Sequence, residues 1–133
     1  MKNLHTVTTV IEAGAGLALL CNPSAVLDLL LGTELDTPAT VILGRLTGAA
    51  LLALGVACWL ARSDAASRAA RGLVAAMLLY NFAAVVLFTF AGFGLGLHGV
   101  ALWPAAVLHA VMAVWCLACL QLRPPAKSIA TRI

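Results

Sequence analysis

The chain has 133 residues, of which 63% are hydrophobic and 10% are charged, and its formal net charge is +3. With a mean hydropathy of +1.06, it has too few polar residues to cover the surface of a water-soluble domain, and its composition indicates an integral membrane protein. The small positive charge gives no reason to expect nucleic-acid binding. The lipid bilayer is therefore the first partner that the sequence predicts.

Four stretches of the chain are long and apolar enough to cross a bilayer, which takes about 20 residues of helix. An irregular or open-sheet backbone cannot face lipid, and the stretches lack the alternation of a membrane β-barrel. The predicted fold is therefore all-α: a polytopic membrane protein whose single domain, residues 1–122, is a bundle of four transmembrane helices. The expected spans are 4–21, 38–61, 70–93 and 99–121, and residues 123–133 are expected to form a mobile cytoplasmic tail.

The segment "CNPSAVLDLLLG", residues 21–32, is expected to end the first helix. Asn22 can cap a new helix, and Pro23 suits the first helical position, where no backbone N–H is needed. Because Asp28 is the one charged residue in this segment, we expect a short interfacial helix after the first span. A kinked extension of the first helix is the alternative. The Thr-Pro pair at residues 37–38 gives a similar start signal for the second span.

Basic residues orient the predicted bundle. If the four spans alternate in direction, one side receives nearly all the lysines and arginines, whereas the opposite loops carry acidic residues and a histidine. Because cytoplasmic loops are enriched in lysine and arginine, we expect both termini to lie in the cytoplasm. The basic residues are Lys2, Arg62, Arg68, Arg71, Arg123, Lys127 and Arg132, and the opposite loops contain Asp28, Glu34, Asp36 and His98.

Each predicted span contains one strongly polar residue, and these are Glu12, Arg45, Asn81 and His109. Counting at about 1.5 Å per residue places them roughly 10 to 17 Å below the outer surface, in one layer. A lone charge at this depth costs about 2.5 to 3.5 kcal/mol on insertion scales, so a partner is expected. Because Glu12 is the other charged residue inside a span and a guanidinium group is long, we predict an ion pair between Glu12 and Arg45.

Two interpretations of this polar layer remain open. Buried polar pairs can specify how helices dock, and Gly44 with Gly48 forms a motif that permits close helix approach. Alternatively, the four side chains bind a small amphipathic ligand, such as a quinone or a lipid, because ionisable residues deep in a membrane are typically functional. Leu52 and Phe88 would then cover the apolar body of the ligand, and the glycines of residues 92–99 would leave a loosely packed turn beside its entrance.

Redox or metal chemistry is a weaker expectation. Cys116 and Cys119 have CxxC spacing, and Cys58 lies at a similar depth. The pair falls inside a helix near the reducing cytoplasm, however, and cysteine also serves as a small packing residue. The histidine and methionines of the last two spans lack a dedicated spacing for copper or haem. We therefore assign no catalytic residue, no metal ligand and no cofactor, and an enzyme is the least favoured class.

Three stretches carry a resemblance to a known family: "LGRLTGAALLALGVACWLA" over residues 43–61, "LLYNFAAVVLFTFAG" over 78–92 and "LWPAAVLHAVMAVWCL" over 102–117. With them the chain resembles the DoxX-like group of small bacterial four-helix membrane proteins. The resemblance implies an inner-membrane bundle and, as for some members, association with quinone-linked or thiol redox complexes. A role as an accessory subunit of such a complex, or as a homo-oligomer, is therefore a further expectation. Arg45, which follows a glycine, is the one residue carried over from the family.

The small multidrug exporters are a rival resemblance, because they also have four helices, about this length and a glutamate in the first span, like Glu12. Those proteins show weak charge bias and have no arginine facing the glutamate. A glutamate held by Arg45 would remain ionised and would be a poor proton carrier. Proton-coupled transport of small molecules is kept as an alternative function, and a purely structural accessory role is another.

Overall fold

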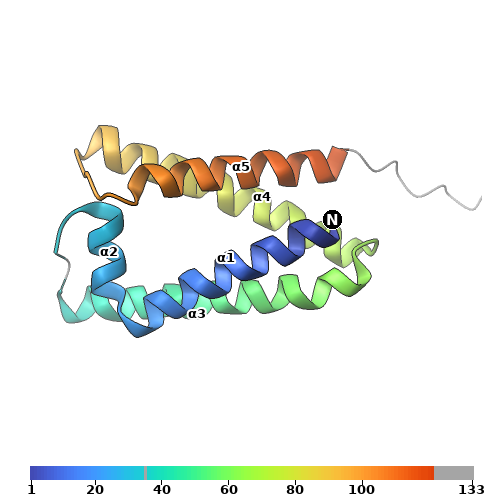
Figure 1. Cartoon of the computed structure of the whole chain (residues 1–133), viewed down its shortest axis with the longest axis horizontal. Helices are drawn as coiled ribbons and strands as arrows, with labels where there is room; N and C mark the ends of the chain where they lie inside the picture. Colours follow the sequence, from blue (N-terminus) through green and yellow to red (C-terminus); the bar gives the residue numbers. More distant parts are fainter. Residues whose placement is uncertain (35, 122–133) are drawn as a thin grey trace, which may run out of the picture.

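The computed structural model describes residues 1–34 and 36–121, and it is helical throughout these ranges apart from short connections (Figure 1). The predicted tail, residues 123–133, lies outside the described residues. Four described helical segments are long and apolar enough to cross a membrane, and they coincide with the four predicted spans. The elements are α1 (Lys2–Cys21), α2 (Pro23–Leu31), α3 (Pro38–Ala61), the 3₁₀ turn η1 (Arg62–Asp64), α4 (Arg68–Thr89), the π-helical turn η2 (Phe90–Gly94) and α5 (Leu102–Gln121).

The long helices are arranged as two pairs. Helix α1 packs along α3 and α4 packs along α5, whereas the two pairs contact each other less extensively. Figure 1 shows α1 and α3 in the lower part, α4 and α5 in the upper part, and α2 standing across the left end between them. We call that end of the molecule the α2 end, and we call the opposite end, where α1 begins, the N-terminal end.

At the N-terminal end all four long helices meet in one buried cluster. Its members are Leu4 of α1, Cys58 of α3, Val74 and Met77 of α4, and Met112 and Cys116 of α5. The unbranched methionine and small cysteine side chains can fill irregular gaps between helices. The cluster closes the bundle at this end.

Glycines allow α1 and α3 to approach until their backbones touch. A Cβ atom on Gly16 would lie 2.7 Å from the carbonyl oxygen of Gly48, and a Cβ on Gly48 would lie 2.7 Å from that of Gly16. Nearer the start of α1, the Thr9 hydroxyl shares its proton between the carbonyl of His5 at 2.8 Å, within α1, and the carbonyl of Gly55 at 3.1 Å, on α3. The prediction that Gly48 belongs to a close-approach face is confirmed, because small residues let helix backbones pack directly. Gly44, its predicted companion, instead contacts Pro23.

A break at Asn22 separates α2 from α1. The backbone leaves the helical region there, and the Asn22 side chain accepts a hydrogen bond from the amide of Ala25 at 3.2 Å. Pro23 occupies the start of α2 and is buried against α3. The chain therefore forms a separate short helix rather than a kinked extension of α1. At the start of α3, Thr37 caps the amide of Thr40, as the sequence predicts.

The end of α2 docks directly on the turn before α5. Gly32 ends α2 with φ of 69°, a left-handed conformation that favours glycine. A Cβ on Gly99 would overlap the backbone of Leu30, and the amide of Ala101 donates to the carbonyl of Leu29 at 2.8 Å. The expectation that the glycines of residues 92–99 leave this turn loosely packed is wrong at Gly99, because the missing side chain is what allows the close docking of α2. It is also wrong at Gly92, which is buried against Trp103.

Large apolar side chains point outward from each of the long helices. Val10, Leu46, Leu79 and Val114 each expose about two-thirds of their surface. Such a surface is unlike that of a water-soluble monomer and needs lipid or another apolar partner to cover it. The finding fits the four candidate membrane spans.

Apart from Glu12 in α1 and Arg45 in α3, the described charged residues separate between the two ends of the molecule. The N-terminal end carries the described part of the predicted basic set, and the α2 end carries the acidic residues and the histidine of the opposite loops. Asp64 is the acidic residue at the basic end. Arg123, Lys127 and Arg132 lie outside the described residues. The basic residues placed at the N-terminal end are Lys2, Arg62, Arg68 and Arg71.

Candidate functional site

A cavity of about 400 Å³ lies between the helix pairs in the half of the bundle toward the α2 end. All five α-helices contribute to its lining, and most of the lining is apolar. Its polar members are Glu12, Thr47, Tyr80 and His109. Because Thr47, Leu29 and Leu108 are also exposed on the outside of the molecule, the cavity opens to the surroundings of the bundle. This volume and composition are typical of a small-molecule site.

The Glu12 side chain is buried in the lining of this cavity, with 3% of its surface exposed. The described residues offer it no ion pair and no hydrogen bond. The predicted Glu12–Arg45 ion pair is therefore wrong for the structure described. A buried carboxyl group without a positive partner is costly in an apolar environment unless it is neutralised by a proton or by a cationic ligand.

Arg45 lies on the outer surface of α3 and is exposed. The buried face of α3 contains Gly44, Gly48 and Leu51. Because successive helical residues are rotated by about 100°, the residue after Gly44 turns away from that face. A long side chain so close to the start of α3 can extend its guanidinium toward the membrane boundary, so it needs no buried partner.

His109 is held by a short chain of hydrogen bonds between α5 and α4. Its Nδ1 lies 2.8 Å from Oδ1 of Asn81, and the Asn81 amide nitrogen donates to the carbonyl of Met77 at 2.7 Å. Since the amide nitrogen of Asn81 is committed to that carbonyl, its Oδ1 is the acceptor and Nδ1 of His109 carries the proton. In a neutral ring this leaves Nε2 with a free lone pair. Tyr80 contacts the ring edge-on, and Phe88 lies against it.

Two polar groups of the lining were missed in the sequence analysis. The Thr47 hydroxyl donates to the carbonyl of Leu43 at 2.8 Å, so its proton is used within α3 while its oxygen can still accept. The Tyr80 hydroxyl has no hydrogen-bond partner among the described residues. Tyr80 is the single tyrosine of the chain and adjoins Asn81, and a polar aromatic inside a predicted span was a signal that could have identified it.

The structure thus brings together three of the four predicted site residues. Glu12 and His109 line the cavity, and Asn81 stands behind His109, buried and bonded to it. Arg45 does not join them. Of the two residues predicted to contact the apolar body of a ligand, Phe88 lines the cavity but Leu52 does not; its neighbour Leu51 lines it instead.

The polar residues of α1 bear on whether the polar layer binds a ligand or only specifies how the helices dock. His5, Thr8 and Glu12 share one buried face of α1, and the first two expose only 1% of their surfaces. His5 Nε2 and Thr8 Oγ1 have no hydrogen-bond partner in the part of the chain described. A device that docks helices would pair its polar groups, because an unpaired buried polar group costs free energy. The His109–Asn81 bond meets that criterion between α4 and α5, and Thr9 meets it between α1 and α3, but His5 Nε2, Thr8 Oγ1 and the Glu12 carboxyl do not.

Three of the four cysteines lie at the opposite end of the molecule from the cavity, whereas Cys21 is exposed at the end of α1 beside α2. Cys58 and Cys116 are fully buried in the N-terminal cluster, and Cys119 packs against it. All the cysteines within residues 1–34 and 36–121 are free thiols. No group of three or more His, Cys, Asp or Glu side chains in these ranges is arranged to hold a metal ion.

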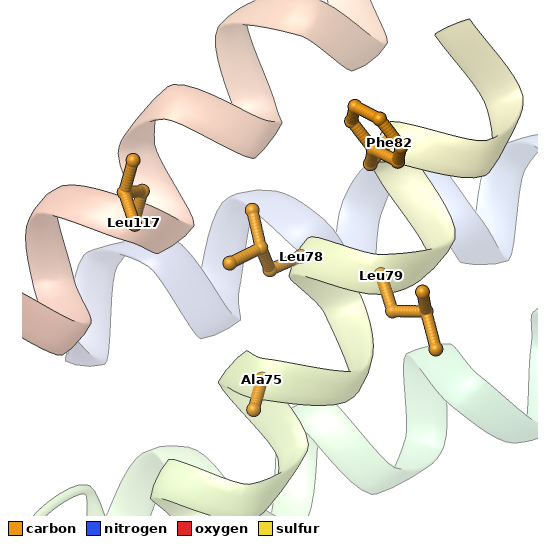
Figure 2. Close-up of a pocket in the computed structure, with 5 residues that line it drawn as sticks. All are labelled: Ala75, Leu78, Leu79, Phe82 and Leu117. Atoms are coloured by element: carbon orange, nitrogen blue, oxygen red, sulfur yellow. The ribbon is translucent and has the colours of Figure 1, made fainter. Parts of the chain in front are cut away.

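A second hollow, of about 370 Å³, is a groove on the outer side of α4 and α5 (Figure 2). Figure 2 shows its residues: Ala75, Leu78, Leu79 and Phe82 come from α4, and Leu117 comes from α5. All five are apolar, so the groove has no group that could orient a polar ligand. It suits the acyl chain of a lipid, whereas the cavity combines an apolar wall with polar groups.

Comparisons with protein-family models, with curated proteins and with solved structures find no match to this chain. The resemblance to the DoxX-like group therefore stays a prediction.

Proposed function

We propose that this chain is a bacterial inner-membrane protein that binds one small amphipathic molecule, quinone-like or lipid-like in shape, in the cavity between its helix pairs. The observation that carries the proposal is the cavity itself, which is enclosed by all five α-helices and combines a largely apolar wall with four polar side chains. Ligand sites in proteins usually have this composition, since apolar surface supplies affinity and a few polar groups fix orientation.

The arrangement of the cavity in the membrane supports entry from the lipid phase. Four of the five described lysines and arginines lie at the N-terminal end, and Arg45 is the exception. Both termini are therefore assigned to the cytoplasm and the α2 end to the outer leaflet. The cavity then lies in the outer half of the bilayer and opens past Thr47, Leu29 and Leu108. A molecule dissolved in the membrane could enter through this opening without crossing water.

A role within a larger assembly is compatible with this site. The outward-facing apolar side chains would tolerate contact with another membrane subunit or with a second copy of the chain. The resemblance to the DoxX-like group favours an accessory subunit of a membrane redox complex. In that case, the bound molecule would be stored for the partner or delivered to it.

Proton-coupled transport is the second candidate, and the unpaired Glu12 favours it. The objection that Arg45 would keep this carboxyl ionised no longer applies, because Arg45 faces outward. A carboxyl group that lines a ligand cavity can exchange a proton for a ligand, which is the minimum requirement for coupled exchange.

The proposal is tested by analysing what the full-length protein retains after purification in mild detergent. Lipophilic molecules extracted from the wild type and quantified by mass spectrometry should include one species at near-stoichiometric amount. Ala105→Leu, which places a larger side chain in the cavity wall, should lose that species. His98→Leu changes an exposed histidine of the α2 end and should retain it. A wild type that retains nothing above a detergent blank would overturn the proposal.

A further inference from the structure

The polar lining of the cavity is rich in hydrogen-bond acceptors and poor in donors. The proton on Nδ1 of His109 is used by Asn81, and the Thr47 hydroxyl proton is used by the carbonyl of Leu43. What these two residues still offer is a lone pair on Nε2 and one on a hydroxyl oxygen. When Glu12 is ionised, its two carboxylate oxygens add further acceptors, and the Tyr80 hydroxyl is then the one uncommitted donor in the described lining.

The charge of the lining is equally one-sided. Within residues 1–34 and 36–121, no lysine or arginine borders the cavity, and Arg45, which could have supplied a positive charge, lies on the outside of α3. An anionic head such as a phosphate or a carboxylate would therefore meet a carboxyl group without a compensating cation. A quinone carbonyl, which needs a hydrogen-bond donor, would find one free hydroxyl in the described lining, that of Tyr80. Both of these ligand heads are poorly matched to the groups present.

The described structure also leaves Glu12 and His109 apart. No ion pair or hydrogen bond joins them, although both line the same cavity. A head group that carries several N–H donors could bond to the Glu12 carboxylate and to Nε2 of His109 together, because an ammonium group has three donors and no acceptor. A positive charge on that head would also neutralise the carboxylate, which removes the main cost of burying it.

We propose that the ligand of this cavity is an apolar molecule with a protonated amine head, and that the head binds between Glu12 and His109. This inference rests on the proposed function and specifies its ligand class. The apolar body of the ligand would lie against Phe88, Leu51 and Leu108, and the alanines of the wall at positions 15 and 105 leave the space that it fills.

The test uses four probes with the same octyl chain and different heads. Octylamine is a cation with N–H donors, octyltrimethylammonium is a cation without donors, octanol is a neutral donor and octanoate is an anion. Binding to the purified full-length protein in detergent micelles is measured by isothermal titration calorimetry, with Ala105→Leu protein as the reference for partitioning into the micelle. We expect octylamine to bind most tightly, octanol and octyltrimethylammonium more weakly, and octanoate least.

Variants assign the preference to the named side chains. Glu12→Gln should weaken octylamine by about tenfold or more, the scale of a hydrogen bond to a charged group, while octanol binding persists and shows that the variant is folded. Tyr80→Phe should weaken octylamine less than Glu12→Gln does. A ligand that needs donors from the protein would give the reverse order, because Tyr80 is the neutral donor of the lining.

Two results would overturn the inference. One is octanol or octanoate binding as tightly as octylamine, and the other is an octylamine affinity unchanged by Glu12→Gln. If those probes still lose binding in Ala105→Leu protein, the cavity remains a ligand site and only the amine assignment fails. If no probe binds above the Ala105→Leu reference and no molecule is retained on purification, the proposed function fails as well.

Discussion

The two ends of the bundle are built from the same four long helices, yet one is closed and the other is hollow. At the N-terminal end, Leu4, Met77 and Met112 reach across the space between the helix pairs and fill it. Toward the α2 end the two helix pairs diverge (Figure 1), and the wall of the space between them includes the short side chains of Ala15 and Ala105. The cavity therefore goes together with the wider spacing of the pairs and with small side chains in its wall.

Helix pairing is common to both ends, and it explains why the hollow end does not collapse. Gly16 and Gly48 hold α1 on α3 near the middle of the bundle, and α2 spans the gap by docking on both pairs. The contact of Gly99 with Leu30 fixes the far side of α2 to the turn before α5. The helix that closes this end of the cavity, α2, is tightly packed on both sides. The cavity is therefore bounded by well-packed backbone and does not result from loose packing.

The largest expected effect comes from separating the helices of one pair. Gly16→Ala should destabilise the protein by about 2 to 4 kcal/mol, because its Cβ would lie 2.7 Å from a backbone oxygen and 2.9 Å from a backbone nitrogen of α3, neither of which can move alone. Gly14 is two residues away and has no atom within 4 Å of such a Cβ. Gly14→Ala should be neutral or stabilising by up to about 1 kcal/mol. Reversible unfolding in mixed micelles, followed by circular dichroism, measures both, and equal effects would contradict the glycine contact.

The same substitution at the two ends tests the contrast between them directly. Ala70 is 1% exposed at the N-terminal end, so Ala70→Leu should overpack that end and cost about 1 to 3 kcal/mol. Ala105→Leu at the hollow end should change the stability by less than about 1 kcal/mol, because the cavity can accept the added carbons. The same unfolding assay compares them. A cost at Ala105 as large as that at Ala70 would mean that the cavity is not available to side chains.

Local signals were sufficient to predict most of the fold. The lengths of the apolar runs gave the four long helices, and Asn22 with Pro23 gave the start of α2. The polar residues of the spans were also found, because a strongly polar side chain is rare inside an apolar run. Depth counting predicts that Glu12 and His109 share one layer, and the structure has both at the same cavity.

Counting residues along a helix gives the depth of a side chain but not the side of the helix on which it lies. Arg45 points away from the cavity because Gly44 and Gly48 occupy the inner face of α3. Had the glycines been used to set the face, Arg45 would have been placed outside. The cavity itself could not be predicted, since it depends on how two helix pairs distant in sequence are spaced and on which side chains line the space between them. The tight packing of Gly99 likewise depends on α2, a separate element.

The third prediction is that substitutions of Glu12 and Arg45 affect stability independently. It follows because Glu12 lines the cavity whereas Arg45 lies on the outside of α3. Arg45→Met should change the stability by less than about 1 kcal/mol, as expected for an exposed side chain. In a double-mutant cycle with Glu12→Gln, the two effects should add to within about 0.5 kcal/mol, because no contact joins the residues. A coupling energy well above that value would show that Glu12 and Arg45 interact after all.

The smallest expected effect concerns the polar face of α1, which leads from the closed end toward the cavity. Thr8 and Thr9 are neighbours, but only Thr9 bonds across to α3, through the carbonyl of Gly55. Thr9→Val should therefore cost about 0.6 kcal/mol, a typical value for a hydrogen bond between membrane helices. Thr8 Oγ1 is buried without a partner among the described residues, so Thr8→Val, which keeps the shape and removes the hydroxyl, should be neutral or stabilising by up to about 1 kcal/mol.

Unfolding in mixed micelles again measures the difference in stability between the Thr8 and Thr9 variants. If Thr8→Val instead costs more than Thr9→Val, the Thr8 hydroxyl has a partner outside the described residues, such as an internal water, and the polar face of α1 extends the hydrated part of the cavity toward the closed end.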